Sequence, residues 1–302
     1  DNLIPLALEN TKYMPYGSEL MYLPDRMPIL YNLRTKQYET LDKNPQQPHE
    51  PIYPVAVFNS PGYVNTSIGA YREQPQANSL PLFSYGAVGW HAGKFRSAVV
   101  QVDSERRQDL RLMPYDHIVA GISEIQLKLP DNRLRRHLEK CALEYGCPAA
   151  KNFFLGRYEA PLPTSQTCNA RCRGCLSLQK DQNIPVSQNR INFTPLPAEI
   201  ADLSLIHLKR VNQSIVSFGQ GCEGDPLLAY KVIEPAIQII RSETDRGTIN
   251  MNTNGSKPDL LVRLFDAGLD SVRISLNSLQ PDCYHAYFQP QKYRFDHVLA
   301  SI

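Results

Sequence analysis

Three cysteines stand close together near the middle of the chain, in Thr167-Cys168-Asn169-Ala170-Arg171-Cys172-Arg173-Gly174-Cys175. Three residues separate the first pair and two separate the second, so the thiols can converge on one face of a loop. Thiolates are soft ligands that suit zinc or iron–sulfur clusters. Most zinc patterns bring a second ligand pair later in the chain, and no such pair follows Cys175. With only three protein ligands, a four-iron cluster would keep one iron open for a small molecule.

Helix and strand patterns alternate after residue 161, an arrangement that favours βα units and a parallel sheet. Pro235 lies within the second helical pattern and is expected to break or restart that helix. A polar or Gly-rich loop follows each strand, and α/β barrels place their sites at such strand ends. Strands are expected at 162–167, 214–218, 248–252 and 271–276. Helices are expected at 197–211, 258–267 and 281–288, and another follows the loop 219–228 and runs through residue 240.

The order of these loops resembles the radical S-adenosylmethionine (radical SAM) superfamily. There, a Cys-x3-Cys-x2-Cys loop follows the first strand and a Gly-Gly-Glu-Pro-like motif follows the second; here Gly224-Asp225-Pro226 stands at the second place, with Asp instead of Glu. The resemblance implies that Cys168, Cys172 and Cys175 hold a 4Fe–4S cluster whose open iron is chelated by SAM. It also implies an enzyme that reductively cleaves SAM to a 5′-deoxyadenosyl radical, which abstracts hydrogen from an unidentified substrate.

The resemblance also implies a SAM pocket built from strand-end residues. Backbone at the second motif would hold the SAM amine, the third strand end would line the pocket, and the fourth would meet the ribose or carboxylate. Ordinary strand-end and turn capping is the alternative role for these side chains. One departure is Gly174, where the family usually has an aromatic residue that touches adenine. The candidate cofactor-binding residues are Gly224, Asp225, Asn252, Ser275 and Asn277, with Asn250 and Asn254 beside them.

The expected fold is α/β, in three parts. Residues 161–302 would form a partial (β/α) radical SAM barrel of about four βα units, where the full core normally has six. Residues 129–160 would form a helical connector, and residues 1–128 a small β-rich domain that resembles no family we can name. The clearest element of the first half is a hairpin of strands at 82–90 and 95–102, with Gly93 in its turn. The chain does not begin with Met, which suggests a fragment of a longer protein.

The composition indicates a globular protein in a reducing compartment. The formal net charge of +2 gives no overall attraction to nucleic acid, and no apolar run is long enough to span a bilayer. An oxygen-sensitive cluster and reduced thiols favour a cytoplasmic location. The expected partner is an electron donor of flavodoxin or ferredoxin type, with no membrane contact.

Three other functions stay open at this point. In an RNA-modifying enzyme, the arginines of the first half would contact RNA, although acidic neighbours favour ordinary surface charge. In a peptide-modifying enzyme, the β-rich half would offer a sheet edge to an extended substrate. A non-catalytic iron–sulfur or zinc-binding module is the third. The arginines in question are Arg106, Arg107, Arg111, Arg133, Arg135 and Arg136.

The remaining cysteines allow a second site. Cys141 and Cys147 could seat a second cluster, although free cysteines are more often buried as small apolar residues. Cys222 stands beside the second motif, where a thiol could donate a hydrogen atom or bind metal, and packing is again the commoner role. Cys283 lies in a helical pattern and is expected to be structural. No metal role is expected for His207, His285 or His297.

Overall fold

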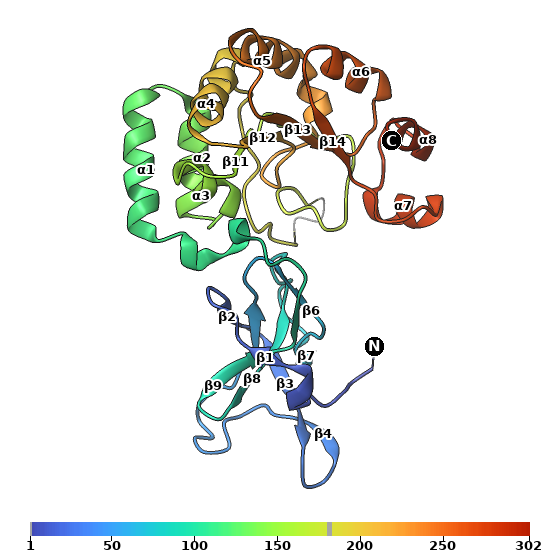
Figure 1. Cartoon of the computed structure of the whole chain (residues 1–302). Helices are drawn as coiled ribbons and strands as arrows, with labels where there is room; N and C mark the ends of the chain where they lie inside the picture. The colour runs from blue at the N-terminus through green and yellow to red at the C-terminus, as the bar shows by residue number, and fades with distance from the viewer. Residues whose placement is uncertain (1, 180–182) are drawn as a thin grey trace. The chain divides into compact units, whose positions relative to one another are not determined.

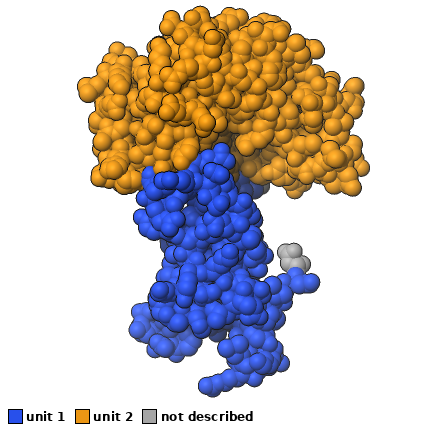
Figure 2. Space-filling model, in the orientation of Figure 1, with its two compact units in different colours: residues 1–112, 183–185 blue, residues 113–182, 186–302 orange. Residues whose placement is uncertain are grey.

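The structure is a computed structural model that describes residues 2–179 and 183–302 (Figure 1). The chain forms two compact units, 1–112 with 183–185, and 113–182 with 186–302 (Figure 2). This division falls before residue 128, the sequence-based limit of the β-rich part. The reason is that α1 (Tyr115–Lys128) packs on the helices that follow it, α2 (Arg133–Leu143) and α3 (Pro148–Phe154). The three predicted domain ranges stay a prediction.

The N-terminal unit is built of short antiparallel strands. The predicted hairpin is confirmed as β8 (Gly86–His91) and β9 (Lys94–Ser97), and Gly93 has the positive φ of 78° that its turn requires. The sheets have the orders β1-β9-β8-β5-β2, β4-β3-β7 and β10-β6. The other strands are β1 (Lys12–Tyr13), β2 (Glu19–Tyr22), β3 (Arg26–Asn32), β4 (Gln37–Thr40), β5 (Val55–Phe58), β6 (Tyr63–Asn65), β7 (Tyr71–Glu73) and β10 (Val99–Gln101), with short 3₁₀ turns at Leu8–Asn10, Arg106–Gln108 and Leu110–Leu112.

The C-terminal unit is centred on a four-stranded parallel sheet, as the alternating patterns predicted, but the first strand lies at Glu159–Pro161 and not at 162–167. The sheet has the order β11-β12-β13-β14, and each strand pairs in parallel with its neighbour. In Figure 1 the helices α4, α5 and α6 lie along one side of the sheet. The strands are β11 (Glu159–Pro161), β12 (Ile215–Phe218), β13 (Thr248–Thr253) and β14 (Ser271–Ile274); the helices are α4 (Pro197–Arg210), α5 (Tyr230–Glu243), α6 (Pro258–Asp266), α7 (Pro281–Phe288) and α8 (Phe295–Ala300).

The two faces of this sheet differ in polarity. Along β13, Ile249 and Met251 are fully buried, whereas the alternate Asn250 and Asn252 are only partly buried. Because side chains alternate between faces along a strand, the asparagines share one face. The register places Ser217, Asn250 and Ser271 in one row and Asn252 beside Arg273 in the next. One face is therefore apolar and the other is lined by polar side chains, as a ligand-binding face requires.

Pro235 does not interrupt its helix, so the expectation of a break there is wrong. A 3₁₀ turn (Pro226–Ala229) leads into α5, and the helix runs from Tyr230 to Glu243 with Pro235 inside it. A proline in this position removes one backbone hydrogen bond. The fully buried Ile233, Ile237 and Ile240 of the same helix offset this loss through apolar packing. Across the described residues, no helix is both long enough and apolar enough to span a membrane.

Candidate functional site

The cysteine loop follows β11 and is fixed by the end of α7. Backbone N–H groups of Arg171 and Arg173 donate to the carbonyls of Phe288 and Tyr287, at 2.9 and 3.0 Å. Cys172 packs against an apolar cluster in which Tyr284 and Val298 are fully buried. The cysteine loop is therefore held in place by α7, α8 and the residues between them, which stand about a hundred positions further along the chain. The whole cluster comprises Tyr284, Phe288, Tyr293, Phe295 and Val298.

The three thiols of this loop are free, half-buried and close enough to interact electrostatically. Burial raises the pKa of Cys168 to about 11 and that of Cys172 to about 12, so both are neutral thiols at neutral pH without a metal. A cationic group and a backbone N–H face the sulfur atoms: the Nη2 of Arg190 lies 3.5 Å from Cys175 Sγ, and the N–H of Ala170 lies 3.4 Å from Cys168 Sγ. Such donors stabilise the thiolates that metal binding creates.

Glu223 joins the cysteine loop to the loop after β12. One carboxylate oxygen accepts the backbone N–H groups of Gly219 and Gln220, at 2.7 and 2.8 Å. The other accepts those of Thr164 and Ser165, both at 2.8 Å. Burial raises the pKa of Glu223 to about 7, while the four N–H donors favour the ionised form. Sequence reasoning missed this residue, whose only signal was a carboxyl group inside a Gly-rich strand-end loop.

Gly224 and Asp225 lie directly against the segment between β11 and Cys168. The N–H of Gly224 donates to the Ser165 carbonyl at 2.6 Å, and that of Asp225 donates to the Thr167 carbonyl at 2.9 Å. A Cβ atom on residue 224 would lie 1.9 Å from the Thr167 oxygen, so the position requires glycine. The second motif is thus placed beside Cys168 by main-chain pairing.

The carboxylate of Asp225 is fully engaged within the protein. It accepts hydrogen bonds from Leu227 N–H at 3.1 Å, Thr253 Oγ1 at 2.8 Å and Asn254 N–H at 2.7 Å. Burial raises its pKa. The side chain of Asp225 therefore joins the second loop to the third.

The third strand end is tied to both preceding loops through asparagines. Asn252 Nδ2 donates to the carbonyls of Phe218 and Gly219, at 3.2 and 3.1 Å. Asn254 Nδ2 donates to Asn169 Oδ1, inside the cysteine loop, at 2.8 Å. The prediction that Asn252 belongs to this strand-end cluster is consistent with these contacts, whereas Asn169 was not predicted.

Ser275 and Asn277 occupy a more open position after β14. Both residues are exposed, and in the described part of the chain no hydrogen bond holds either side chain. The Ser275 N–H donates to the Thr253 carbonyl at 2.8 Å, which keeps this residue level with the end of β13. Their side chains are thus free to meet a ligand at the same edge of the sheet.

An aromatic ring stands next to Gly174, the position at which the aromatic residue of the family is missing. A Cβ atom on residue 174 would lie 2.7 Å from the hydroxyl oxygen of Tyr287. Burial, together with the nearby thiols of Cys172 and Cys175, raises the pKa of this tyrosine. A ring from α7 therefore occupies the space beside the third cysteine.

Residues 162–302 match the family model described as the Radical SAM superfamily, so this part of the chain is a radical SAM domain. The human "Molybdenum cofactor biosynthesis protein 1" is 31% identical over 153 residues, which are 50% of this chain and 22% of the relative. The "FeMo cofactor biosynthesis protein NifB" of Klebsiella pneumoniae is 26% identical over 122 residues, which are 40% of this chain and 26% of the relative. The chain thus spans about a quarter or less of the length of these relatives.

Among solved structures, the FeFe-hydrogenase maturase HydG from Carboxydothermus hydrogenoformans aligns over 62% of this chain and 50% of that chain. The identity is 15% and the TM-score 0.35.

A radical SAM domain has a 4Fe–4S cluster and SAM as its cofactors. The residues present suit both. Three free thiols with cationic and N–H neighbours can become cluster ligands, and the exposed side chains of Ser275 and Asn277 at the neighbouring strand end can meet SAM.

Proposed function

We propose that this chain is a radical SAM enzyme in which Cys168, Cys172 and Cys175 bind the cluster. The observation that carries this proposal is the joining of three strand-end loops around the three thiols. Glu223 fixes the second loop to the cysteine loop, and Asp225 fixes the third loop to the second. When bound, the cluster and SAM supply reductive cleavage of SAM and the resulting hydrogen abstraction from a substrate.

Each protein group has a defined task in this proposal. The backbone carbonyl groups at Gly224 and Asp225 bind the SAM amine, because both N–H groups already donate within the protein and the Asp225 carboxylate is already occupied by three donors. Asn252, Ser275 and Asn277 orient the ribose and carboxylate from the neighbouring strand ends. Burial of the thiols limits access of water and oxygen to the cluster.

Tyr287 takes the part that an aromatic residue at position 174 plays elsewhere in the family. Its ring lies beside the third cysteine, and it comes from α7 instead of the loop itself. An aromatic face next to the cluster can stack on the adenine of SAM. The glycine and the tyrosine are therefore a compensating pair.

The four parallel strands constitute a partial (β/α) barrel in this proposal, and a low-potential flavodoxin- or ferredoxin-like protein supplies the electron. The names of the relatives concern assembly of metal cofactors, but the chain covers only a small part of them. We therefore assign the type of reaction and leave the substrate unassigned.

The arginines give little support to the RNA-modifying alternative. Arg111 pairs with Asp109, Arg133 with Glu199 and Arg136 with Asp131, at 2.8, 2.6 and 3.6 Å. Arg107 and Arg135 also face carboxylates, those of Asp103 and Glu139. These charges are balanced locally, as expected for ordinary surface residues.

The test is production of 5′-deoxyadenosine from SAM by the anaerobically reconstituted protein with dithionite as reductant. We expect turnover in the wild-type protein and none in Cys172→Ala. Cys283→Ser is the matched control, because Cys283 is an exposed cysteine on α7, outside the three loops. Equal product from Cys172→Ala and wild type would overturn the proposal.

A further inference from the structure

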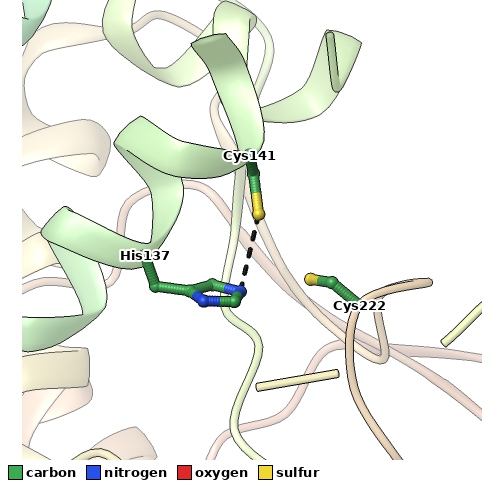
Figure 3. Close-up of side chains that lie close together, drawn as sticks. All are labelled: His137, Cys141 and Cys222. Atoms are coloured by element: carbon green, nitrogen blue, oxygen red, sulfur yellow. Dashed lines mark hydrogen bonds between the residues drawn. The ribbon is translucent and has the colours of Figure 1, made fainter. Parts of the chain in front are cut away.

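A second group of metal-ligating side chains lies in the C-terminal unit, apart from the cysteine triplet. His137 and Cys141 come from α2, and Cys222 comes from the loop after β12 (Figure 3). Figure 3 shows the imidazole ring and the two sulfur atoms directed toward a shared space. Their ligand atoms all lie within 4.8 Å of one another. Across the described residues this is the sole set of three His, Cys, Asp or Glu ligand atoms that meets this spacing.

The secondary structure accounts for this convergence. Residues four apart on a helix project from the same face, so His137 and Cys141 stand one above the other on α2. The two cysteines are buried, 2% and 7% exposed, and His137 is half-buried at the edge of the group. The site is thus closed on the cysteine side and accessible from the histidine side.

The spacing suits a single metal ion better than a cluster. Tetrahedral zinc with ordinary bond lengths separates a sulfur and a nitrogen ligand by about 3.6 Å, and two sulfur ligands by about 3.8 Å. His137 Nε2 lies 3.5 Å from Cys141 Sγ. In a four-iron cluster the ligands bind different irons, so they do not need to gather around one point.

A further thiol, that of Cys147, lies outside the set of ligand atoms that gather within 4.8 Å. The thiol of Cys147 is close enough to interact electrostatically with both Cys141 and Cys222. Its backbone N–H donates to the carbonyl of Cys141 at 2.9 Å, which keeps the start of α3 against the end of α2. Three thiols and one imidazole are a common ligand set of structural zinc.

We infer that His137, Cys141 and Cys222 form a mononuclear zinc site, separate from the site of the cysteine triplet. The ion would join α2 to the loop that carries Glu223, Gly224 and Asp225. Cys222 is adjacent to Glu223, and its carbonyl accepts the N–H of Ile191 at 2.7 Å. A metal ion bound here would therefore attach the loop after β12 to α2, which belongs to the predicted helical connector. The metal site itself does not depend on the proposed radical SAM function.

The test uses the full chain with Cys168, Cys172 and Cys175 all changed to Ser, so that zinc at the triplet cannot contribute. We expect this protein to bind one equivalent of Zn²⁺. With Co²⁺ as the probe, it should give the visible spectrum of tetrahedral thiolate coordination. Adding Cys222→Ser should abolish both signals, whereas adding Cys283→Ser should leave both unchanged.

A histidine variant keeps the inference testable if loss of Cys222 prevents folding. His137 is half-buried, so His137→Gln should fold, bind Zn²⁺ at least tenfold more weakly and shift the Co²⁺ spectrum. An unchanged spectrum and affinity in this variant would overturn the inference. The inference would also be overturned if the reduced triple variant bound no metal. It would equally be overturned if that variant bound iron and sulfide in equal amounts and lost both with Cys222→Ser, because this would indicate a cluster.

Discussion

The cysteine triplet and the His137–Cys141–Cys222 group are two thiol sites in one unit, and they differ in how closely their ligand atoms approach. The ligand atoms of the second group all lie within 4.8 Å of one another, and it is the one such group of His, Cys, Asp or Glu found among the described residues. The triplet comes from one continuous loop, and the second group joins a helix to a distant loop. Ligands spread over a loop can bind different irons of a cluster, and ligands gathered at a point can bind one ion.

The comparison also explains why one site could be predicted and the other could not. Cys168, Cys172 and Cys175 are close in sequence, so their spacing alone indicated a site. Cys222 stands far along the chain from Cys141; each was a possible metal ligand, but nothing in the sequence joined the two, and packing was the commoner role for both. His137 was not singled out at all, because its meeting with Cys222 depends on how α2 packs in the unit.

The largest expected effect is a reciprocal loss of metals. Cys172→Ala should abolish bound iron and leave zinc in place, because only the triplet holds the cluster. Cys222→Ser should remove zinc and leave most of the iron. Metal analysis of the two variants, each purified anaerobically and checked for folding by circular dichroism, measures this. Loss of both metals in both variants would show that the sites are not separate.

The second prediction concerns the connection between the two sites. Glu223→Gln places an amide NH₂ where a carboxylate oxygen now accepts two N–H donors. We expect this change to destabilise the protein by about 3 kcal/mol, since a buried network loses its acceptor. Urea denaturation measures it. Asp282→Asn, at an exposed helix position, is the control and should change stability little. A variant as stable as wild type would contradict the role given to Glu223.

The third prediction is that the stability of the C-terminal unit depends on pH through His207. Burial lowers the pKa of His207 to about 4, and its Nε2 faces the Tyr158 carbonyl at the start of β11. The unfolded state takes up a proton below its ordinary pKa of about 6.5, before the folded state does, so stability falls with decreasing pH. Between about pH 7 and 4.5 this loss is about 2–3 kcal/mol. In His207→Gln, which does not titrate, the loss over this range should be smaller by that amount; an equal loss would contradict the assignment.

The smallest expected effect is on SAM affinity. Tyr287→Ala should weaken SAM binding by about 1–3 kcal/mol if the ring stacks on adenine, and Tyr287→Phe should retain affinity. Equilibrium binding to the reconstituted, unreduced protein measures both. If Tyr287→Ala bound SAM as tightly as the wild-type protein, the proposal that Tyr287 compensates for the glycine at position 174 would be contradicted.

Much of the C-terminal unit followed from local patterns in the sequence. The order of four parallel strands, the helix Pro281–Phe288 and the position of Gly224-Asp225-Pro226 after the second strand were predictable from periodicity and turn residues. The hydrogen bonds that the Asp225 carboxylate accepts were not predictable in this way, since the donors Thr253 and Asn254 belong to another strand and the loop after it. The continuity of α5 was also not predictable from the sequence, because burial of its isoleucines outweighs the local effect of Pro235.

The central claim is that the triplet holds a four-iron cluster with one iron open to SAM. Electron paramagnetic resonance of the reduced, anaerobically reconstituted protein, with and without SAM, tests it most directly. The account predicts a four-iron signal that changes when SAM is added and is absent in Cys172→Ala. A signal that SAM leaves unchanged, or one that persists in this variant, would contradict it.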